Sequence, residues 1–236
     1  MKKSLKILAV IPARKGSKGI PGKNMTKILG KPLIYFTIKN AKKSKYITSI
    51  IVSTDCEKIA KISKKMGAEV PFLRPDKLAT DKTQTFPVIK HAIKQIEKIK
   101  YSKFDYIILL QPTCPLRSFK DIDVSLKRLI LSNSNSITSI VDVGANHPLR
   151  MKIIKKNKLK NYIKQDFENM KPRQELSKVY IRNGAIYAFK RNVIFKEKAL
   201  VSKNNLPYLM PKERSVNIDT QEDLILAKYY LKKNVS

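Results

Sequence analysis

The stretch Lys6-Ile-Leu-Ala-Val-Ile-Pro-Ala-Arg-Lys-Gly-Ser-Lys-Gly-Ile-Pro-Gly-Lys-Asn24 decides the fold of this chain. Its first part, Lys6–Pro12, is a short β-rich apolar run that predicts a buried strand. Its second part, from Ile11 to Asn24, holds three glycines, two prolines and four basic side chains in 14 residues. A basic, glycine-rich loop between a strand and a helix is typical of a phosphate-binding site in an α/β protein.

The chemistry of this loop suits a polyphosphate. Glycines let backbone N–H groups approach a ligand closely, and the cations of Arg14, Lys18 and Lys23 would surround it. A Walker A loop is excluded, because five residues separate Gly16 from Gly22 where that motif needs four. The dinucleotide fingerprint Gly-x-Gly-x-x-Gly is absent as well. An ordinary basic turn between a strand and a helix is the alternative.

The apolar pattern along the chain alternates between strands and helices. Further strands are predicted at Ile47–Thr54, Tyr106–Leu110, Ser136–Val143 and Val179–Phe189. Helices are predicted from Pro32 to Lys43, Glu57 to Met66, Thr85 to Lys98, Lys120 to Leu131 and Gln221 to Leu231. This alternation predicts an α/β fold with a doubly wound, mostly parallel, Rossmann-like sheet. Ligands of such sheets bind beyond the carboxyl ends of the strands, which selects the loops after Ile11, Thr54 and Leu110.

The length of 236 residues predicts a single domain, 1–236. The alternation weakens between residues 144 and 178, where the sequence is polar and rich in lysine. That segment is interpreted as a flexible excursion or as an inserted subdomain.

The composition of the chain limits the kinds of partner that it can bind. Fifty Lys and Arg against 18 Asp and Glu leave a net charge of +32, which suits a nucleotide, a nucleic acid or an anionic membrane surface. The lysines are spread over nearly every polar position and form no aromatic-interleaved patch, so solvated faces account for most of the charge. There is no run of 18 apolar residues, and the apolar part of the N-terminus is too short for a signal peptide. Two cysteines do not make a disulfide framework, and a cytoplasmic location is predicted.

The chain resembles a known family along most of its length. The first loop, Ile11 to Asn24, resembles the signature of the acylneuraminate cytidylyltransferases, the CMP-sialic acid synthetases. The other blocks that carry this resemblance follow in family order: Ser53-Thr-Asp55, Arg74-Pro75, Leu78-Ala-Thr-Asp81, Leu110-Gln-Pro-Thr-Cys-Pro-Leu-Arg117, Asn183-Gly-Ala-Ile-Tyr187 and Val216-Asn-Ile-Asp219. Together they span about residues 6 to 230.

The resemblance implies a fold, a reaction and partners. The fold would be of the nucleotide-diphospho-sugar transferase type, and residues 144–178 would form a dimerisation insert that reaches the active site of a second copy. The reaction would transfer CMP from CTP to the anomeric hydroxyl of a nonulosonic (sialic-acid-like) acid, with release of pyrophosphate and help from Mg²⁺. A homodimer is expected, and no specific nucleic acid or membrane partner. The alternatives are a cytidylyltransferase for a shorter 3-deoxy sugar acid and a non-catalytic basic nucleotide- or RNA-binding protein.

The resemblance also assigns residues. Arg14 and Lys23 match contacts to the CTP phosphates and are the predicted catalytic residues. The predicted nucleotide-binding residues are Arg14, Lys18, Lys23, Asn24, Arg74, Thr83 and Thr85, and the predicted sugar-binding residues are Gln111, Arg150, Arg173, Asn183 and Tyr187. Arginine suits a sugar-acid carboxylate because it can donate two hydrogen bonds at once. Thr85 could instead be a helix N-cap, Gln111 could satisfy loop backbone, and Tyr187 could belong to the core.

Two positions depart from the family pattern. The arginine of the family's Arg-Pro-Asn-Gly block is displaced by one residue to Arg182, which on a strand faces the opposite side, so Arg182 receives no family role. Where many relatives have Asp-x-Asp, this chain has Asn217-Ile-Asp219. Asp219 is the predicted metal ligand and Asn217 its partner, because alternate strand positions share a face and an amide oxygen can ligate Mg²⁺. The alternative for Asp219 is the N-cap of the last helix.

Three further side chains receive no chemical role. His91 and His147 have no companion at metal-ligand spacing, so packing or surface roles are predicted for both. Cys114 lies in a loop where relatives usually have serine, and no nucleophilic role is assigned to it.

Overall fold

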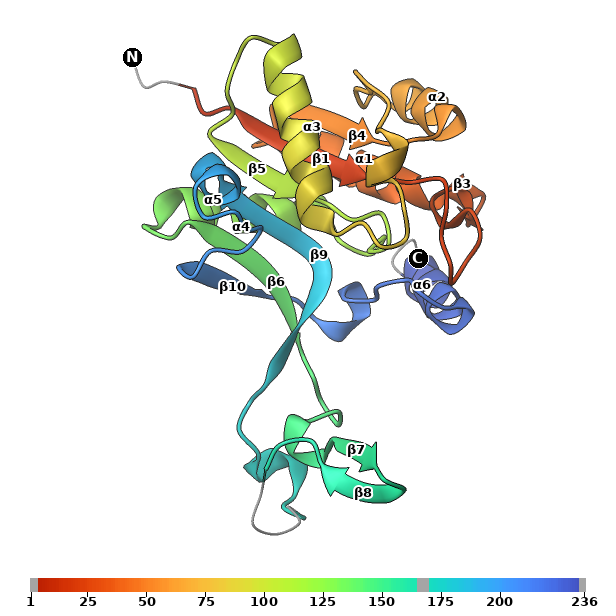
Figure 1. The fold of residues 1–236 in the computed structure, drawn as a ribbon, viewed down its shortest axis with the longest axis vertical. Helices are drawn as coiled ribbons and strands as arrows, with labels where there is room; N and C mark the ends of the chain where they lie inside the picture. Colours follow the sequence, from red (N-terminus) through yellow and green to blue (C-terminus); the bar gives the residue numbers. More distant parts are fainter. Residues whose placement is uncertain (1–3, 165–169, 234–236) are drawn as a thin grey trace.

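A six-stranded sheet forms the centre of the body, in the order β10 (Asn205–Leu209), β6 (Ser136–Asp142), β9 (Tyr180–Lys190), β5 (Tyr106–Leu109), β1 (Ile7–Pro12) and β4 (Ser49–Ser53). This computed structural model describes residues 4–164 and 170–233 of the chain (Figure 1). Strand β1 pairs in parallel with β4 and β5, and β10 pairs in parallel with β6. Only β9 runs antiparallel, between β5 and β6. The predicted α/β class with a mostly parallel sheet is confirmed.

Strand β1 is buried on both faces, which is why its sequence is continuously apolar rather than alternating. Ile7, Ala9 and Ile11 face one core cluster, and Leu8 and Val10 face another. The first cluster includes residues of α1 (Leu33–Lys43), α2 (Glu57–Lys65) and α4 (Phe119–Leu131). The second includes residues of α3 (Thr85–Ile99) and α5 (Arg191–Phe195). Helices therefore cover both faces of the sheet, as a doubly wound fold requires.

Every strand and helix expected from the sequence is present, with ends shifted by at most two residues. The last of them is α6 (Gln221–Lys233), which packs on Ile20, Ile28 and Leu33 beside the first loop. The elements missed were α5, β10 and two hairpins, β2 (Lys27–Ile28) with β3 (Lys31–Pro32) and β7 (Lys152–Lys155) with β8 (Lys158–Asn161). Strand β10 carries Pro207, which weakens a strand pattern but is tolerated at the edge of a sheet.

Within the segment 144–178, called the arm below, the described residues 144–164 and 170–178 project from the body (Figure 1), and residues 165–169 lie outside the described part. Strands β6 and β9 run out of the sheet as a pair and carry the hairpin β7–β8 beyond it. The pairing of β6 with β9 shifts register between Thr138 and Ile140, which bends the pair. Several large apolar side chains of the arm are exposed, among them Ile154 at 79% and Leu159 at 69%. The weak sequence pattern here reflects an element without a core of its own.

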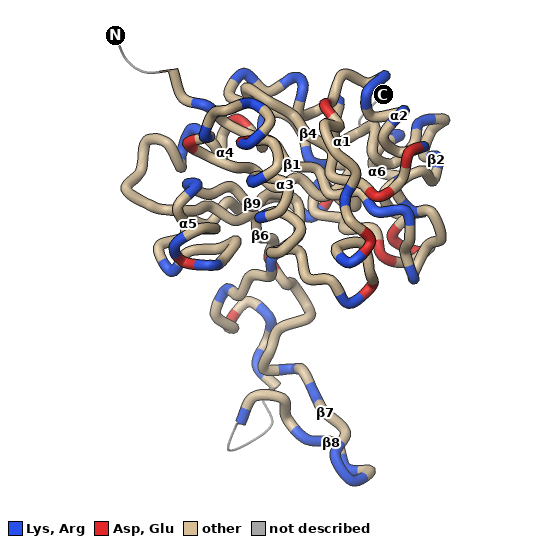
Figure 2. The backbone as a smooth tube through the Cα atoms, turned by 45° about the horizontal axis from the view of Figure 1, so that its top comes forward, with Lys and Arg blue, Asp and Glu red and all other residues tan. Residues whose placement is uncertain are grey.

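Charge is spread over the whole molecule. Lys and Arg occur on most elements of the body and along the arm, with few Asp and Glu between them (Figure 2). Within the described ranges, no helix is long and apolar enough to cross a membrane.

A buried carboxylate joins α4 to the far edge of the sheet. Asp121 forms a capping box with Ser118 at the start of α4. Its oxygens also accept hydrogen bonds from Tyr208 of β10, at 2.8 Å, and from Arg214 Nη2, at 2.9 Å. Burial opposes the charged form, but the hydrogen bonds from Arg214, Ser118 and Tyr208 outweigh it and hold the pKa of Asp121 below its usual value.

We expect Asp121→Ala to lower the free energy of unfolding at pH 7 by about 2–4 kcal/mol, since it removes half of a capping box and three charge-assisted hydrogen bonds from Tyr208 and Arg214. Because folding lowers the pKa of Asp121, this contribution is full above the pKa of the unfolded chain and is lost as the pH falls through the folded value. The difference in the free energy of unfolding between variant and wild type should therefore disappear below about pH 4. Urea titrations at several pH values measure it, with Asp76→Ala, at an exposed aspartate, as the control. An equal gap at every pH would contradict this role.

Candidate functional site

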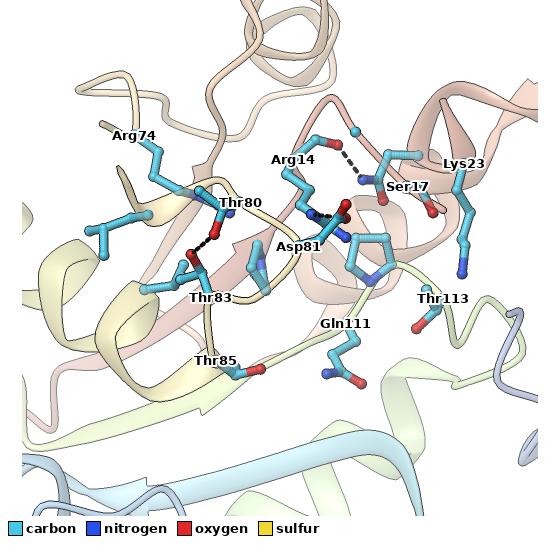
Figure 3. Close-up of a pocket in the computed structure, with 16 residues that line it drawn as sticks. Arg14, Ser17, Lys23, Arg74, Thr80, Asp81, Thr83, Thr85, Gln111 and Thr113 are labelled. Carbon is cyan, nitrogen blue, oxygen red and sulfur yellow. Dashed lines mark hydrogen bonds and ion pairs between the residues drawn. The ribbon is translucent and has the colours of Figure 1, made fainter. Parts of the chain in front are cut away.

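A pocket opens beyond the carboxyl ends of β1 and β5, where the sequence places the phosphate loop (Figure 3). Three segments line most of it, and α3 supplies the rest. The three segments are the first loop (Pro12, Arg14, Gly16, Ser17, Lys23, Asn24), the segment 74–85 (Arg74, Leu78, Thr80, Asp81, Thr83, Thr85) and the loop after β5 (Gln111, Pro112, Thr113). The residue from within α3 is Val88. The loop after β4 does not line the pocket itself. The lining residue Arg74 connects the pocket to this loop through hydrogen bonds to Ser53 and Thr54.

Arg14 faces the pocket and meets a carboxylate there. Its Nη1 lies 2.7 Å from Asp81 Oδ1 and 3.5 Å from the carbonyl oxygen of Ala79. Lys18 is not among the residues that line the pocket; its Nζ lies 3.9 Å from Asp81 Oδ2 and its side chain is 80% exposed. Two of the predicted phosphate-binding cations thus share one aspartate, which no sequence argument singled out.

Lys23 joins the first loop to the segment before α6. Its Nζ donates to the carbonyl oxygen of Ile218 at 2.7 Å and to Asp219 Oδ1 at 2.8 Å, and the residue is only 8% exposed. Asn217 Nδ2 donates to the other oxygen of Asp219 at 2.7 Å. Asp219 is therefore held by an ammonium on one side and by an amide on the other.

Asp219 is not the cap of the last helix. Thr220 and Asp223 bond reciprocally there: Thr220 N donates to Asp223 Oδ2 at 2.9 Å, and Asp223 N donates to Thr220 Oγ1 at 3.3 Å. The carboxylate of Asp219 is therefore not used for capping; it bonds Lys23 and Asn217, and neither Asp219 nor Asn217 is among the residues that line the pocket.

Asn24 and Arg74 shape the pocket wall through internal hydrogen bonds. Asn24 Nδ2 donates to the carbonyl oxygen of Arg14 at 2.9 Å, which fixes the path of the loop. Arg74 donates from Nε to Ser53 Oγ at 3.2 Å and from Nη2 to the carbonyl oxygen of Ser53. Burial lowers the pKa of Arg74 to about 10. Both residues line the pocket and at the same time tie it to β1 and β4.

The segment before α3 contributes hydroxyl groups. Thr80 Oγ1 and Thr83 Oγ1 lie 2.7 Å apart, and Thr85 is the first residue of α3 (Figure 3). The residue at the N-cap position is Gln84, so the N-cap interpretation of Thr85 is wrong.

The loop from Gln111 to Arg117 forms the floor between the first loop and β9. Its Thr113 carbonyl oxygen accepts from Ile218 N at 2.8 Å. Gly184 has a φ of +76°, and a Cβ there would lie 2.8 Å from Gln111 Oε1, so only glycine lets β9 approach this side chain. Gln111 lies in the pocket lining, near Thr85 and Thr113 in Figure 3.

Arg117 is a buried charge that sequence reasoning assigned no role. It is 1% exposed, and it donates to the carbonyl oxygens of Ala185, at 2.6 Å, and Gln111, at 3.3 Å, and to Thr37 Oγ1, at 2.8 Å. Burial lowers its pKa to about 10. Its place at the end of the block from Leu110 to Arg117, which carries part of the family resemblance, was the signal in the sequence.

The predicted sugar-side residues of β9 lie outside the pocket lining. Asn183 is buried, accepts from Ser139 Oγ at 2.6 Å and donates to Ser215 Oγ at 2.9 Å. Tyr187 packs against the cluster that contains α3 and α5, and burial raises its pKa. Arg182 is exposed, and so is Ile181 before it, so burial does not test the expected change of face.

Arg150 and Arg173 belong to the arm and are exposed. Arg150 Nη2 donates to the carbonyl oxygen of Lys171 at 2.9 Å, and Arg173 lines a separate hollow at the base of the arm. Neither lines the pocket of its own chain.

The donors beside Lys23 suit a hard divalent cation in part. Magnesium is bound in many enzymes by one or two carboxylates together with substrate phosphates, and the oxygens of Asp219 and Asn217 are of that kind. In the part of the chain that the structure describes, no group of three or more His, Cys, Asp or Glu side chains could hold a metal by itself. The donor set therefore fits a metal that arrives with a phosphate ligand.

Three polar side chains outside the pocket lining are held by packing or by internal hydrogen bonds. His147 donates from Nε2 to the carbonyl oxygen of Ser177 and accepts from Leu149 N, which fixes the base of the arm. His91 packs edge-on against Phe72, and burial lowers its pKa. Burial raises the pKa of the Cys114 thiol to about 11, so it stays protonated at neutral pH.

The sequence matches the family described as Cytidylyltransferase over residues 8–233. The chain belongs to the cytidylyltransferase family. Its resemblance to the acylneuraminate cytidylyltransferases is thereby confirmed, and so is its class, a nucleotidyltransferase.

Curated relatives of this cytidylyltransferase are similar over nearly its whole length. The post-translational flagellin modification protein B of Campylobacter coli is 32% identical, over 96% of this chain and 95% of that protein. The CMP-N,N'-diacetyllegionaminic acid synthase of Legionella pneumophila is 33% identical, over 98% of both. The N-acylneuraminate cytidylyltransferase of Escherichia coli is 33% identical, over 94% of this chain and 51% of that longer protein.

Solved structures share the fold of this cytidylyltransferase. A CMP:2-keto-3-deoxy-manno-octonic acid synthetase in complex with CTP superposes with a TM-score of 0.70, at 19% identity, over 97% of this chain and 99% of that one. A 4-diphosphocytidyl-2C-methyl-D-erythritol synthase from Anaerococcus prevotii superposes with a TM-score of 0.65, at 17% identity, over 98% and 100%.

A close backbone contact joins the first loop of this cytidylyltransferase to the segment that carries Asp219. A Cβ on Gly19 would lie 2.2 Å from the carbonyl oxygen of Asp219, a distance that real side chains do not reach. A Cβ on Gly16 would meet nothing within 4 Å. The two glycines of one loop thus make a matched pair, in which only Gly19 is required by packing.

We expect Gly19→Ala to push the first loop away from Asp219 and to weaken CTP binding by about tenfold or more, because overpacking costs about 1–3 kcal/mol. Gly16→Ala, the matched control, should bind CTP within about twofold of the wild type. Calorimetry with CTP measures both, and circular dichroism checks that both are folded. Equal affinities of the two variants would refute the role of this contact.

Proposed function

We propose that this cytidylyltransferase transfers CMP from CTP to the anomeric hydroxyl of a nonulosonic acid. The proposal that CTP is the nucleotide substrate rests on the pocket, in which Arg14, Lys23 and the glycine loop lie at the carboxyl ends of β1 and β5. The sugar half is supported by relatives of about 30% identity that are named for legionaminic, pseudaminic and acylneuraminic acids.

The proposed reaction is a displacement at phosphorus. The anomeric oxygen forms a bond to the α-phosphorus, its proton passes to water, and the bond from that phosphorus to the leaving pyrophosphate breaks. Negative charge grows on the pyrophosphate, so catalysis needs cations held in place before the reaction starts. Arg14 and Lys23 are the residues of this chain suited to that task, because both line the pocket and Lys23 is fixed there by two short hydrogen bonds.

We propose Mg²⁺ as the cofactor, with Asp219 and Asn217 as its protein ligands beside the phosphates. When bound, it would neutralise phosphate charge during the transfer. The exposure of the Asp219 side chain, 64%, supports access of a hydrated metal with its nucleotide.

The proposed acceptor is an acid, so its carboxylate needs a cation. Arg150 and Arg173 carry that role in the proposal, delivered by the arm of a second copy, since neither lines the pocket of its own chain. Gln111, Asn183 and Tyr187 form the sugar side of the same proposal. The two free cysteines are consistent with the proposed cytoplasmic location.

A panel of acceptors tests the function. The protein is incubated with CTP, Mg²⁺ and one acid at a time: N-acetylneuraminate, legionaminate, pseudaminate and 3-deoxy-manno-octulosonate. We expect pyrophosphate release with at least one nine-carbon acid. Release with the eight-carbon acid alone would replace the proposed substrate by the shorter one. No release with any acid, together with tight and salt-sensitive binding of RNA, would replace the enzyme by a binding protein.

We expect Arg14→Ala to lower kcat by about 100-fold or more, because a fixed positive charge is lost from the site where charge develops. The variant should keep the melting temperature of the wild type within a few degrees, since the Arg14 side chain is part-exposed. Arg128→Ala, at an exposed arginine of α4, is the control and should keep full activity. Turnover of Arg14→Ala near the wild-type rate would remove this residue from the mechanism.

We also propose that the protein is a homodimer formed through the arm, residues 144–178. The exposed Ile154 and Leu159 support this, because apolar side chains on a projecting element favour burial against a partner. A dimer would bring the arm arginines to the pocket of the other copy.

We expect Ile154→Asp/Leu159→Asp to shift the protein from dimer to monomer in light scattering at micromolar concentration. The control is Ile225→Asp on α6, at an isoleucine that is 69% exposed and outside the arm. A wild-type monomer would contradict the proposed assembly, and so would an Ile154→Asp/Leu159→Asp variant that stays dimeric.

A further inference from the structure

Asp81 is a negative charge in a pocket otherwise built to hold phosphates. It lines the pocket, and its side chain is 41% exposed. Its two oxygens lie near two cations of the first loop, Arg14 at 2.7 Å and Lys18 at 3.9 Å (Figure 3 shows the Arg14 contact). A carboxylate in this position must be explained, because it repels the polyphosphate that the loop attracts.

Asp81 occupies a donor that a phosphate would need. Its contact uses Nη1 of Arg14, which also lies 3.5 Å from the carbonyl oxygen of Ala79. The same N–H groups cannot serve Asp81 and a phosphate oxygen together at full strength. The ion pair is also open to solvent, with 28% of the Arg14 side chain exposed, so exchange of one anion for another costs little.

The contact is not needed to hold the segment 74–85 in place. Arg74 anchors its start through Ser53 and through a backbone hydrogen bond of 2.7 Å to Thr54. The pair Thr80 and Thr83 closes the turn around Asp81 with a hydroxyl contact of 2.7 Å. The Asp81 carboxylate is therefore free to leave Arg14 while its backbone stays where it is.

We infer that Asp81 is an internal competitor of the nucleotide phosphates for Arg14, and that it sets how tightly the site holds CTP and pyrophosphate. The inference rests on the proposed function in one respect, that polyphosphate binds at Arg14. Without a ligand, Asp81 neutralises the guanidinium and keeps it turned toward the pocket. When polyphosphate binds, it displaces Asp81. As pyrophosphate leaves, the carboxylate returns to Arg14, which speeds the departure of this product.

The direct test measures the affinity for inorganic pyrophosphate and for CTP by calorimetry in wild type, Asp81→Asn and Asp76→Asn. We expect Asp81→Asn to bind both ligands about two- to fivefold more tightly, the range expected for loss of a part-exposed ion pair that competes with the ligand. The gain should shrink as NaCl is raised, because salt screens the competing pair. Asp76→Asn removes the same charge from the same segment at an exposed position and should bind like the wild type. Unchanged or weaker binding by Asp81→Asn would overturn the inference.

A double-mutant cycle separates competition at Arg14 from a general change of the local field. We expect Asp81→Asn to give no gain in pyrophosphate affinity when it is added to Arg14→Ala, because the contested donor is then gone. The same gain in both backgrounds would overturn the inference in favour of a field effect. Circular dichroism of each variant confirms folding.

These measurements need no sugar acid, so their outcome is separate from that of the acceptor panel. Tighter pyrophosphate binding by Asp81→Asn without turnover on any acid would support the role of Asp81 and reject the proposed acceptor class. Turnover on a nonulosonic acid with unchanged pyrophosphate affinity in Asp81→Asn would reject the role of Asp81 alone.

Discussion

The buried guanidinium of Arg117 is the interaction on which the site depends. It reaches α1 through Thr37, β9 through the carbonyl oxygen of Ala185, and its own loop through the carbonyl oxygen of Gln111. A charge without solvent needs partners for its donors, and Nη1 and Nη2 of Arg117 have them, while its buried Nε has none among the described residues. The bonds that are made leave the loop little freedom to move. The loop in turn carries Thr113, which bonds the backbone of Ile218. The floor of the pocket and the segment beside Lys23 are thereby fixed to the core.

The cations predicted to hold phosphate are each paired with a carboxylate. Each cation predicted to hold phosphate has a carboxylate partner from a distant segment: Arg14 has Asp81, and Lys23 has Asp219. In a chain with 18 acidic residues against 50 basic ones, placing two carboxylates here is a marked departure from the average surface. Such pairs keep long cationic side chains oriented toward the ligand and cost little to exchange when they are part-exposed.

The arm shows where pattern analysis of a single chain reaches its limit. A strand is recognised by the alternation that burial imposes, and the arm has no core in this chain to impose one. The sequence of the hairpin β7–β8 is therefore mostly polar, with isolated apolar residues, and shows no strand pattern. The strands that carry it, β6 and β9, were recognised because most of their length lies in the central sheet.

The sequence by itself determined the architecture of the body and the place of the site. Burial of β1 on both faces leaves a continuous apolar run, and the glycines and cations after it are local features of the chain. Only the tertiary structure decided which distant groups meet those cations. Asp81, Asp219 and Arg117 carry no local pattern that names their partners, because an ion pair between segments depends on how the sheet brings loops together. The close contact of Gly19 with Asp219 follows from the same packing, since it joins the two ends of the chain.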